Sequence, residues 1–191
     1  MVKRCGLFLA SAVAAFCLGG GMHGFPEEAV KRAEKGTHKY EAFEPSEKCA
    51  ACHKQISIQY QQSAMAKAQA LPWDQAEYFQ FALPHTRIET KVAPVEAGCI
   101  NCHAPQAFLA GDVPPPPVGK ADPKADGVSC DLCHAIVGFD GDAPANGNFA
   151  VSPGKVKHGS REDSRPMGHE SRRSAFYKSA ELCGTCHDES S

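Results

Sequence analysis

Four short segments share the pattern Cys-x-x-Cys-His, which holds two thiols and an imidazole at one fixed spacing. Two thiols at this spacing can add to the two vinyl groups of one porphyrin while the adjacent histidine binds the iron, so the pattern is the attachment signature of a c-type heme. The four copies span residues 49–53, 99–103, 130–134 and 183–187. The sequence therefore predicts four covalently bound hemes c.

Each motif residue has a predicted role. The cysteines that form thioether bonds are Cys49, Cys52, Cys99, Cys102, Cys130, Cys133, Cys183 and Cys186. The proximal iron ligands are His53, His103, His134 and His187. Cysteine pairs also build zinc sites or disulfide frameworks, but zinc does not require a histidine directly after the second cysteine, and all four pairs have one. The two cysteines outside the motifs, Cys5 and Cys17, fall in the N-terminal segment.

The N-terminal segment has the features of a secretory signal peptide. Residues 1–24 begin with Lys3 and Arg4, continue through an apolar run over residues 7–16, and end in small residues. This run is shorter than the ~20 residues of a membrane-spanning helix, and no other segment is apolar enough to span a membrane. We therefore expect cleaved export to the periplasm or the extracellular space, and a tetraheme domain over residues 25–191.

Composition predicts a fold built around its cofactors. About 167 residues would remain after cleavage, and four hemes shared among so few residues would supply much of the buried apolar surface. We expect a mainly α fold with long loops, little β-sheet, and a core built around four covalently bound hemes. Removing Lys3 and Arg4 changes the formal charge from −2 to about −4, which disfavours a nucleic-acid partner.

One stretch is locally basic against this acidic background. Its residues either pair with heme propionates or solvent, or form a docking patch for an acidic redox partner. They are Lys155, Lys157, Arg161, Arg165, Arg172 and Arg173.

Proline, glycine and capping residues place the expected elements. The motif spacings of 50, 31 and 53 residues suggest two half-units, although the halves share little else. We expect helices over residues 25–36, 47–70 and from Asp74 to Pro84, surface loops over 112–127 and 138–160 with an extended piece near 148–151, and a last helix that starts at Ser171 or Ser174 and delivers Cys183.

The opposite face of each iron decides between a carrier and an enzyme. An iron with protein ligands on both faces passes electrons, whereas an open face can bind a substrate. His23 lies beside the expected cleavage site. The distal candidates are His38, His85, His158, His169 and Met65.

Met65 complicates the count of distal ligands. It follows His53 by twelve residues on what is expected to be one helix, which separates the two by about 18 Å. It cannot bind the iron of His53, but it could bind another iron and raise that heme's potential, or pack on a porphyrin edge. Met167, near His169, carries a weaker form of the same ambiguity.

The surroundings of the motifs resemble the cytochrome c-554 family, which shares motifs with octaheme hydroxylamine oxidoreductase and tetrathionate reductase. The resemblance covers most of residues 45–188. It is carried by Tyr60-Gln-Gln-Ser-Ala-Met65 after the first motif, Gly98-Cys-Ile-Asn-Cys-His-Ala-Pro105, Gly127-Val-Ser-Cys-Asp-Leu-Cys-His134, and His169 ahead of Ser179-Ala-Glu-Leu-Cys-Gly-Thr-Cys-His-Asp188.

The resemblance implies a mainly helical fold with hemes stacked in parallel and perpendicular pairs, close enough for rapid electron transfer. Such proteins carry Ser-x-His where this chain has Met65, and that histidine binds another heme. This departure implies an unusual methionine-ligated or open heme. The chain ends four residues after His187, which fits a compact carrier or the N-terminal part of a longer enzyme.

Three functions are consistent with these features. We favour an exported, non-enzymatic electron carrier with redox protein partners as donor and acceptor. The alternative is an oxidoreductase of small nitrogen or sulfur compounds that works at one five-coordinate heme. A third hypothesis is self-association into a heme filament, in which a histidine such as His38 binds a neighbour's iron.

Overall fold

Prolines and glycines divide the helical part of the chain into short pieces. The computed structural model describes residues 31–116 and 127–189, so the expected signal peptide and most of the proline-rich loop lie outside the described residues. The helices are α1 (Ser46–Ala50), α2 (Lys54–Gln62), α3 (Pro72–Ala76), α4 (Leu83–Thr86), α5 (Val95–His103), α6 (Pro105–Ala110), α7 (Cys130–Ala135) and α8 (Glu181–His187), with the 3-10 turns η1 (Tyr40–Ala42), η2 (Met65–Lys67), η4 (Thr90–Val92) and η6 (Ala175–Lys178) and the π-helical turn η3 (Glu77–Ala82). The predicted mainly helical fold with long loops is confirmed.

Helix α6 lies at the centre of the protein core. Pro105 begins it, and Gly111 ends it in the left-handed conformation at φ +88°, as is typical of a helix C-terminus. Every residue of Pro105–Leu109 is buried. Around α6 gathers one hydrophobic cluster, which includes Phe43, Ile100, Leu132, Ile136 and Phe149. The chain therefore builds a small apolar core of its own.

The segment before η1 crosses α6 as an irregular strap. Ala33 N donates to Phe149 O at 2.7 Å, and Gly36 N donates to Phe108 O at 3.2 Å. The helix predicted over residues 25–36 is therefore wrong for residues 31–36, because their amides bond to the core segments instead of to one another. Residues 25–30 lie outside the described residues.

The single helix predicted over residues 47–70 is broken twice. His53 separates α1 from α2 with ψ 48°, and Ser63 ends α2 in an extended conformation with ψ 154°. The Ser63 hydroxyl donates to Tyr60 O at 2.7 Å and accepts from Ala66 N at 3.2 Å, so it caps the break. His53 and Met65 are not on one helix.

Helix α3 continues through η3 into α4. Leu71 precedes it as N-cap and Pro72 begins it, so Asp74 lies in its first turn and is not the cap. The helix also passes Pro84, where it was predicted to end. In an α-helix, proline lacks an amide donor and its ring clashes with the carbonyl four residues earlier. The preceding π turn η3 is wider, because its hydrogen bonds join residues five apart, and Pro84 is accommodated directly after it.

The strands form two small sheets, which agrees with the prediction of little β-sheet. Strand β1 (Ile136–Gly138) pairs antiparallel with β2 (Ala150–Val151), and Ile136 faces Val151. Strand β3 (Val156–Gly159) pairs parallel with β4 (Glu170–Arg173), and Val156 faces Glu170. The extended piece expected near residues 148–151 is confirmed by β2.

The last motif helix begins later than predicted. Residues 170–173 form β4, Ser174 precedes the 3-10 turn η6, and α8 starts only at Glu181. Ser171 therefore lies in β4 and Ser174 precedes η6, so neither serine begins the helix that carries Cys183.

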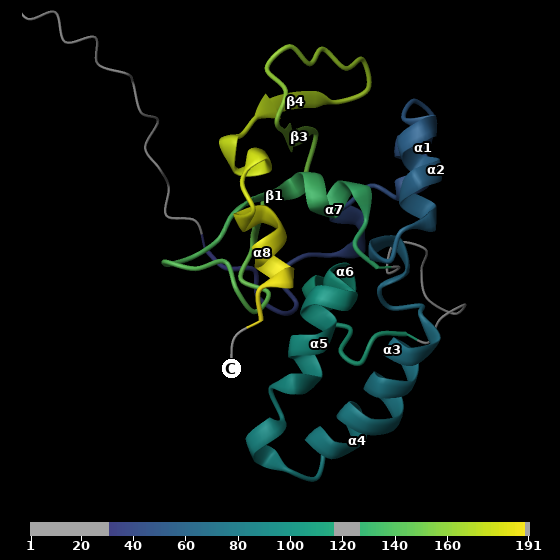
Figure 1. Cartoon of the computed structure of the whole chain (residues 1–191), viewed down its shortest axis with the longest axis vertical. Helices are drawn as coiled ribbons and strands as arrows, with labels where there is room; N and C mark the ends of the chain where they lie inside the picture. Colours follow the sequence, from purple (N-terminus) through teal and green to yellow (C-terminus); the bar gives the residue numbers. More distant parts are fainter. Residues whose placement is uncertain (1–30, 117–126, 190–191) are drawn as a thin grey trace, which may run out of the picture.

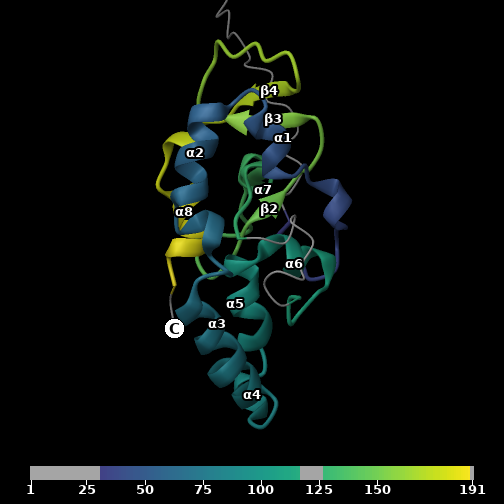
Figure 2. The ribbon, with the colours of Figure 1, turned by 90° about the vertical axis from the view of Figure 1, so that its right-hand side faces the viewer.

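The molecule is elongated (Figure 1). Helices α3 and α4 lie at one end and the β3–β4 sheet at the other, and the view turned by 90° shows the same order (Figure 2). Helix α7 lies near the sheet, and α5 and α6 occupy the middle and lower part. Within residues 31–116 and 127–189, no helix is long and apolar enough to cross a membrane.

Candidate heme sites

Each Cys-x-x-Cys-His motif lies on a short helix or at its end. The first spans the end of α1 and the turn before α2, and the others lie on α5, α7 and α8. Residues three and four apart share one face of a helix. The two thiols and the imidazole of each helical motif therefore project from the same side, as attachment to one porphyrin requires. Within the described residues, none of the eight motif cysteines forms a disulfide bond.

The third motif helix, α7, has its own N-cap. Ser129 is extended, and its hydroxyl accepts a hydrogen bond from Leu132 N at 3.1 Å. Cys130 N, the first amide of the helix, donates to Ser46 Oγ at 3.3 Å. This second bond ties the third motif to the start of α1, which carries the first motif.

The thiols join the motifs in alternate pairs. The thiol of Cys49 interacts with that of Cys130, and the thiol of Cys102 with that of Cys186, so the first motif meets the third and the second meets the fourth. The interaction with Cys49 lowers the pKa of Cys130 to about 6, and the interaction with Cys102 lowers the pKa of Cys186 to about 7. The spacings suggested consecutive half-units, but these contacts cross between the two halves of the chain.

A turn at residues 144–148 lies between the second and fourth motifs. Asn101, inside the second motif, is 2% exposed and donates from Nδ2 to Gly147 O at 2.8 Å. Asn146 N donates to the carbonyl oxygen of Asp188, just after the fourth motif, at 2.9 Å. Gly147 adopts φ +69° and approaches Asn101 so closely that it leaves no room for a side chain. The turn is therefore hydrogen-bonded to the second motif and to the residue after the fourth.

Two motif histidines are oriented by backbone carbonyls. His134 Nδ1 lies 2.6 Å from His158 O, and His103 Nδ1 lies 3.1 Å from Ala68 O. A carbonyl can only accept, so Nδ1 is the donor in both rings and the lone pair is on Nε2. This is the arrangement that fixes a histidine for metal binding through Nε2. Asp74 Oδ1 adds a second partner, 3.4 Å from His103 Nδ1.

Tyr177 holds the His134 ring from the side. The two rings are stacked, with centroids 5.9 Å apart and planes 13° apart. The Tyr177 hydroxyl lies 2.6 Å from Cys133 O and 3.0 Å from Ile136 O, to which it donates. Burial raises the pKa of Tyr177. The phenol is thus a neutral group fixed to the end of the third motif.

His169 lies against the first motif. Its ring centroid is 6.2 Å from that of His53, with the planes tilted by 34°. His169 Nδ1 donates to Glu170 O at 2.8 Å, which leaves Nε2 as the metal-binding nitrogen. Two imidazoles that share one metal through bonds of roughly 2 Å have ring centroids roughly 6 Å apart. The separation of His53 and His169 fits this geometry.

The other distal histidine candidates occupy different places. His158 lies on β3 and is buried, and burial lowers its pKa. His38 lies in the strap over α6, with its ring 6.1 Å from that of Phe43, and burial also lowers its pKa. His85 is exposed on α4.

Met65 lies in η2, which in the folded structure contacts the second motif and the segment before the third. Its carbonyl oxygen accepts from Val128 N at 2.9 Å, just before the third motif, and Ala68 of the same turn bonds to His103. Its side chain is 43% exposed. The backbone around Met65 therefore contacts the second motif and the segment before the third.

Three of the six residues of the basic stretch are paired with carboxylates of the chain. Lys157 meets Asp131, Arg161 Nη2 lies 3.1 Å from Asp163 Oδ2, and Arg173 Nε lies 2.8 Å from Glu162 Oε1. The Arg161–Asp163 pair is exposed to solvent, whereas the Lys157–Asp131 pair is buried.

Several residues that support the motifs were not found from the sequence. Tyr177, Asp131 and Asn101 contact motif residues, but only their positions inside or near a motif could have signalled a role. Gln106, three residues after His103, is 1% exposed, and neither of its amide heteroatoms has a hydrogen-bond partner within the described residues. Such a buried amide suits a polar group of a bound molecule, so together with the thiol and imidazole donors the residues fit heme.

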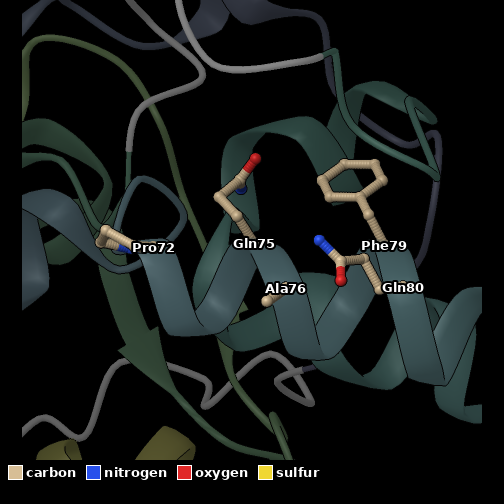
Figure 3. Close-up of a pocket in the computed structure, with 5 residues that line it drawn as sticks. All are labelled: Pro72, Gln75, Ala76, Phe79 and Gln80. Atoms are coloured by element: carbon tan, nitrogen blue, oxygen red, sulfur yellow. The ribbon is translucent and has the colours of Figure 1, made fainter.

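The structure also contains a pocket on the helix that begins at Pro72. Five side chains of α3 and η3 line a cavity of about 360 Å³ (Figure 3). They are Pro72, Gln75, Ala76, Phe79 and Gln80. None of these five is a motif residue.

Attachment motifs on short helices, with their histidines oriented by carbonyls, define a multiheme c-type cytochrome. Residues 48–135, which hold the first three motifs, match the family model described as cytochrome c554 and c-prime. Over this segment the chain is similar to the cytochrome c554 family, and the similarity supports a heme electron-transfer protein with covalently bound heme c. The fourth motif lies outside the matched segment.

One solved structure that is similar to this chain is a penta-heme cytochrome c552 from Thermochromatium tepidum. It is 16% identical, with a TM-score of 0.47, over 79% of this chain and 47% of that chain. The chain thus spans about half of the length of that protein. No curated protein sequence matches the chain.

Proposed function

We propose that the chain is an exported tetraheme c-type cytochrome that carries electrons between redox protein partners. Each heme would supply an iron that accepts and releases one electron. The eight motif cysteines would hold the four hemes, and His53, His103, His134 and His187 would bind their irons. The electron-transfer role is supported by the pairing of motifs through thiol contacts, because paired attachment sites bring the electron-carrying sites close together.

The thiol contacts support two neighbouring pairs. Cys49 and Cys130 would place the first and third hemes side by side, and Cys102 and Cys186 would do the same for the second and fourth. The turn at residues 144–148 would hold the second pair in register. Electrons would then have a short step within each pair.

The distal ligands determine whether all four sites only carry electrons. We assign His169 to the iron of His53, because their ring separation of 6.2 Å fits one shared metal. The candidates for the distal ligands of the other three irons are His38, His85, His158 and Met65. With a protein ligand on each face, no iron would bind a substrate.

Carbon monoxide binding and electron paramagnetic resonance test this assignment on the purified holoprotein. Mass spectrometry is expected to find four hemes per chain, the oxidised protein to be low-spin, and the reduced protein to bind no stoichiometric carbon monoxide. His169→Ala is expected to convert one heme per chain to a high-spin form that binds carbon monoxide. Met167→Leu is the control, because Met167 is fully exposed near His169.

Each outcome has a distinct meaning. A native protein that binds carbon monoxide at one heme per chain would overturn the pure carrier and favour the alternative, an oxidoreductase of small nitrogen or sulfur compounds. The half-exposed Met65 at the position of a histidine is the observation that favours this alternative. An unchanged spectrum in His169→Ala would refute the ligand assignment alone.

A further inference from the structure

A buried ion pair lies inside the third motif. Asp131 stands between Cys130 and Cys133, and its side chain is 1% exposed. Its Oδ2 accepts from Glu44 N at 2.8 Å, and its Oδ1 meets the ammonium of Lys157 as an ion pair, not as a well-directed hydrogen bond. The Lys157 side chain is 11% exposed, so both charges are largely removed from water.

The pair connects the motif helix to strand β3. Lys157 lies on β3 directly before His158, whose carbonyl binds His134 Nδ1, and its ammonium also donates to Gly154 O. Asp131 and its lysine therefore lie on the two elements that orient the iron ligand of the third motif. The nearby Lys48–Glu44 pair differs, because its side chains are 64% and 40% exposed.

Burial makes the two charges of the pair matter to a neighbouring iron. Charges in a protein interior interact more strongly than charges in water, and a buried charge without its partner is costly. The potential of a c-type heme depends on nearby charge and on solvent exposure. A carboxylate placed between the two thioether-forming cysteines favours the ferric iron, which has one positive charge more than the ferrous iron. An adjacent ammonium cancels this effect.

We propose that Lys157 compensates the charge of Asp131 and thereby sets the reduction potential of the heme attached through Cys130 and Cys133. The inference rests on the function proposed above, since it requires a heme at this motif. Reduction of this site adds one electron from a one-electron donor to ferric iron and gives ferrous iron. The uncompensated carboxylate would oppose this step, and Lys157 removes the opposition. Lys157 is thus a positioning and charge-balancing residue, not a ligand.

Potentiometric titration of three variants at one fixed pH tests the proposal. Lys157→Met is expected to lower the midpoint potential of one heme. Asp131→Asn is expected to raise it, because it leaves the ammonium unbalanced. The double variant is expected to return close to the native potential, since neither charge remains. Arg161→Met is the control, because its ion pair with Asp163 is 75% exposed on both sides.

These measurements distinguish failure of the proposed function from failure of the charge-balancing role of Lys157. If mass spectrometry finds no heme on Cys130 and Cys133, the proposed function fails. If the heme is present and low-spin but neither single variant shifts a potential more than the Arg161→Met control does, the charge-balancing role is overturned. Shifts of the single variants that fail to cancel in the double variant also overturn it. Should Lys157→Met not fold, Asp131→Asn alone still decides, because a potential that is unchanged or lower contradicts the proposal.

Discussion

Replacement of Gly147 by alanine tests the turn that clasps the second and fourth motifs. Gly147 adopts φ +69°, where a non-glycine residue loses about 1–2 kcal/mol. An added Cβ would lie 2.1 Å from Asn101 Nδ2 and 2.9 Å from its Cγ, so the amide must move. This movement breaks the 2.8 Å bond to Gly147 O and leaves a buried amide unpaired, at about 1–3 kcal/mol. We expect Gly147→Ala to lower the free energy of unfolding by about 2–5 kcal/mol.

Urea unfolding of the holoprotein, followed by far-ultraviolet circular dichroism, measures this loss. Gly141→Ala is the matched control, because Gly141 has a similar φ of +76° but nothing within 4 Å of its added Cβ. It is expected to lose only the backbone part, about 1–2 kcal/mol. Combining Gly147→Ala with Asn101→Ala removes the clashing amide, so the double variant is expected to lose less than the sum of the two. Equal losses in Gly147→Ala and Gly141→Ala would refute the close-contact argument.

Two further predictions concern the third motif. Tyr177→Phe removes the hydroxyl that donates to Cys133 O and Ile136 O, so it is expected to lower the free energy of unfolding by about 1–2 kcal/mol. The electron paramagnetic resonance spectrum is expected to stay unchanged, because the stacked ring is kept. Tyr177→Leu is expected to alter that spectrum as well, and identical spectra would exclude a role for stacking. Ser129→Ala removes the N-cap of α7 and is expected to lower the free energy of unfolding by about 1 kcal/mol. Ser152→Ala is the control and is expected to change this free energy little, because Ser152 is exposed. Equal losses in the two variants would show that the cap does not stabilise the protein.

The helical character and the cytochrome class were predictable because they depend on local patterns. Cys-x-x-Cys-His is a contiguous motif, whereas the helix starts at Pro72 and Pro105 were not predicted. The break at Ser63 was not predictable in the same way, because a distant contact stabilises it. Met65 O accepts from Val128 N, and a Cβ on Gly127 would lie 2.4 Å from Met65 O. This approach requires glycine, and it replaces the continuation of α2.

The surroundings of the motifs depend on contacts that no local pattern encodes. The spacing of the motifs suggested consecutive halves, but the thiols of Cys49 and Cys130 meet across most of the domain. Likewise, His169 was one of five distal candidates, and only its approach to His53 distinguishes it. The partners of buried groups such as Asp131 follow from the folded arrangement of α7 and β3, which the sequence does not reveal.

The alternate pairing of motifs bears on whether the chain can be divided. A break between the second and third motifs would give two fragments, each with two attachment sites, yet both thiol contacts would be severed. Two-heme modules of this protein therefore cannot be produced by separating its first and second halves. A duplication of either half would double the attachment sites without creating a native pair. The smallest unit that keeps one complete pair must run from the first motif through the third.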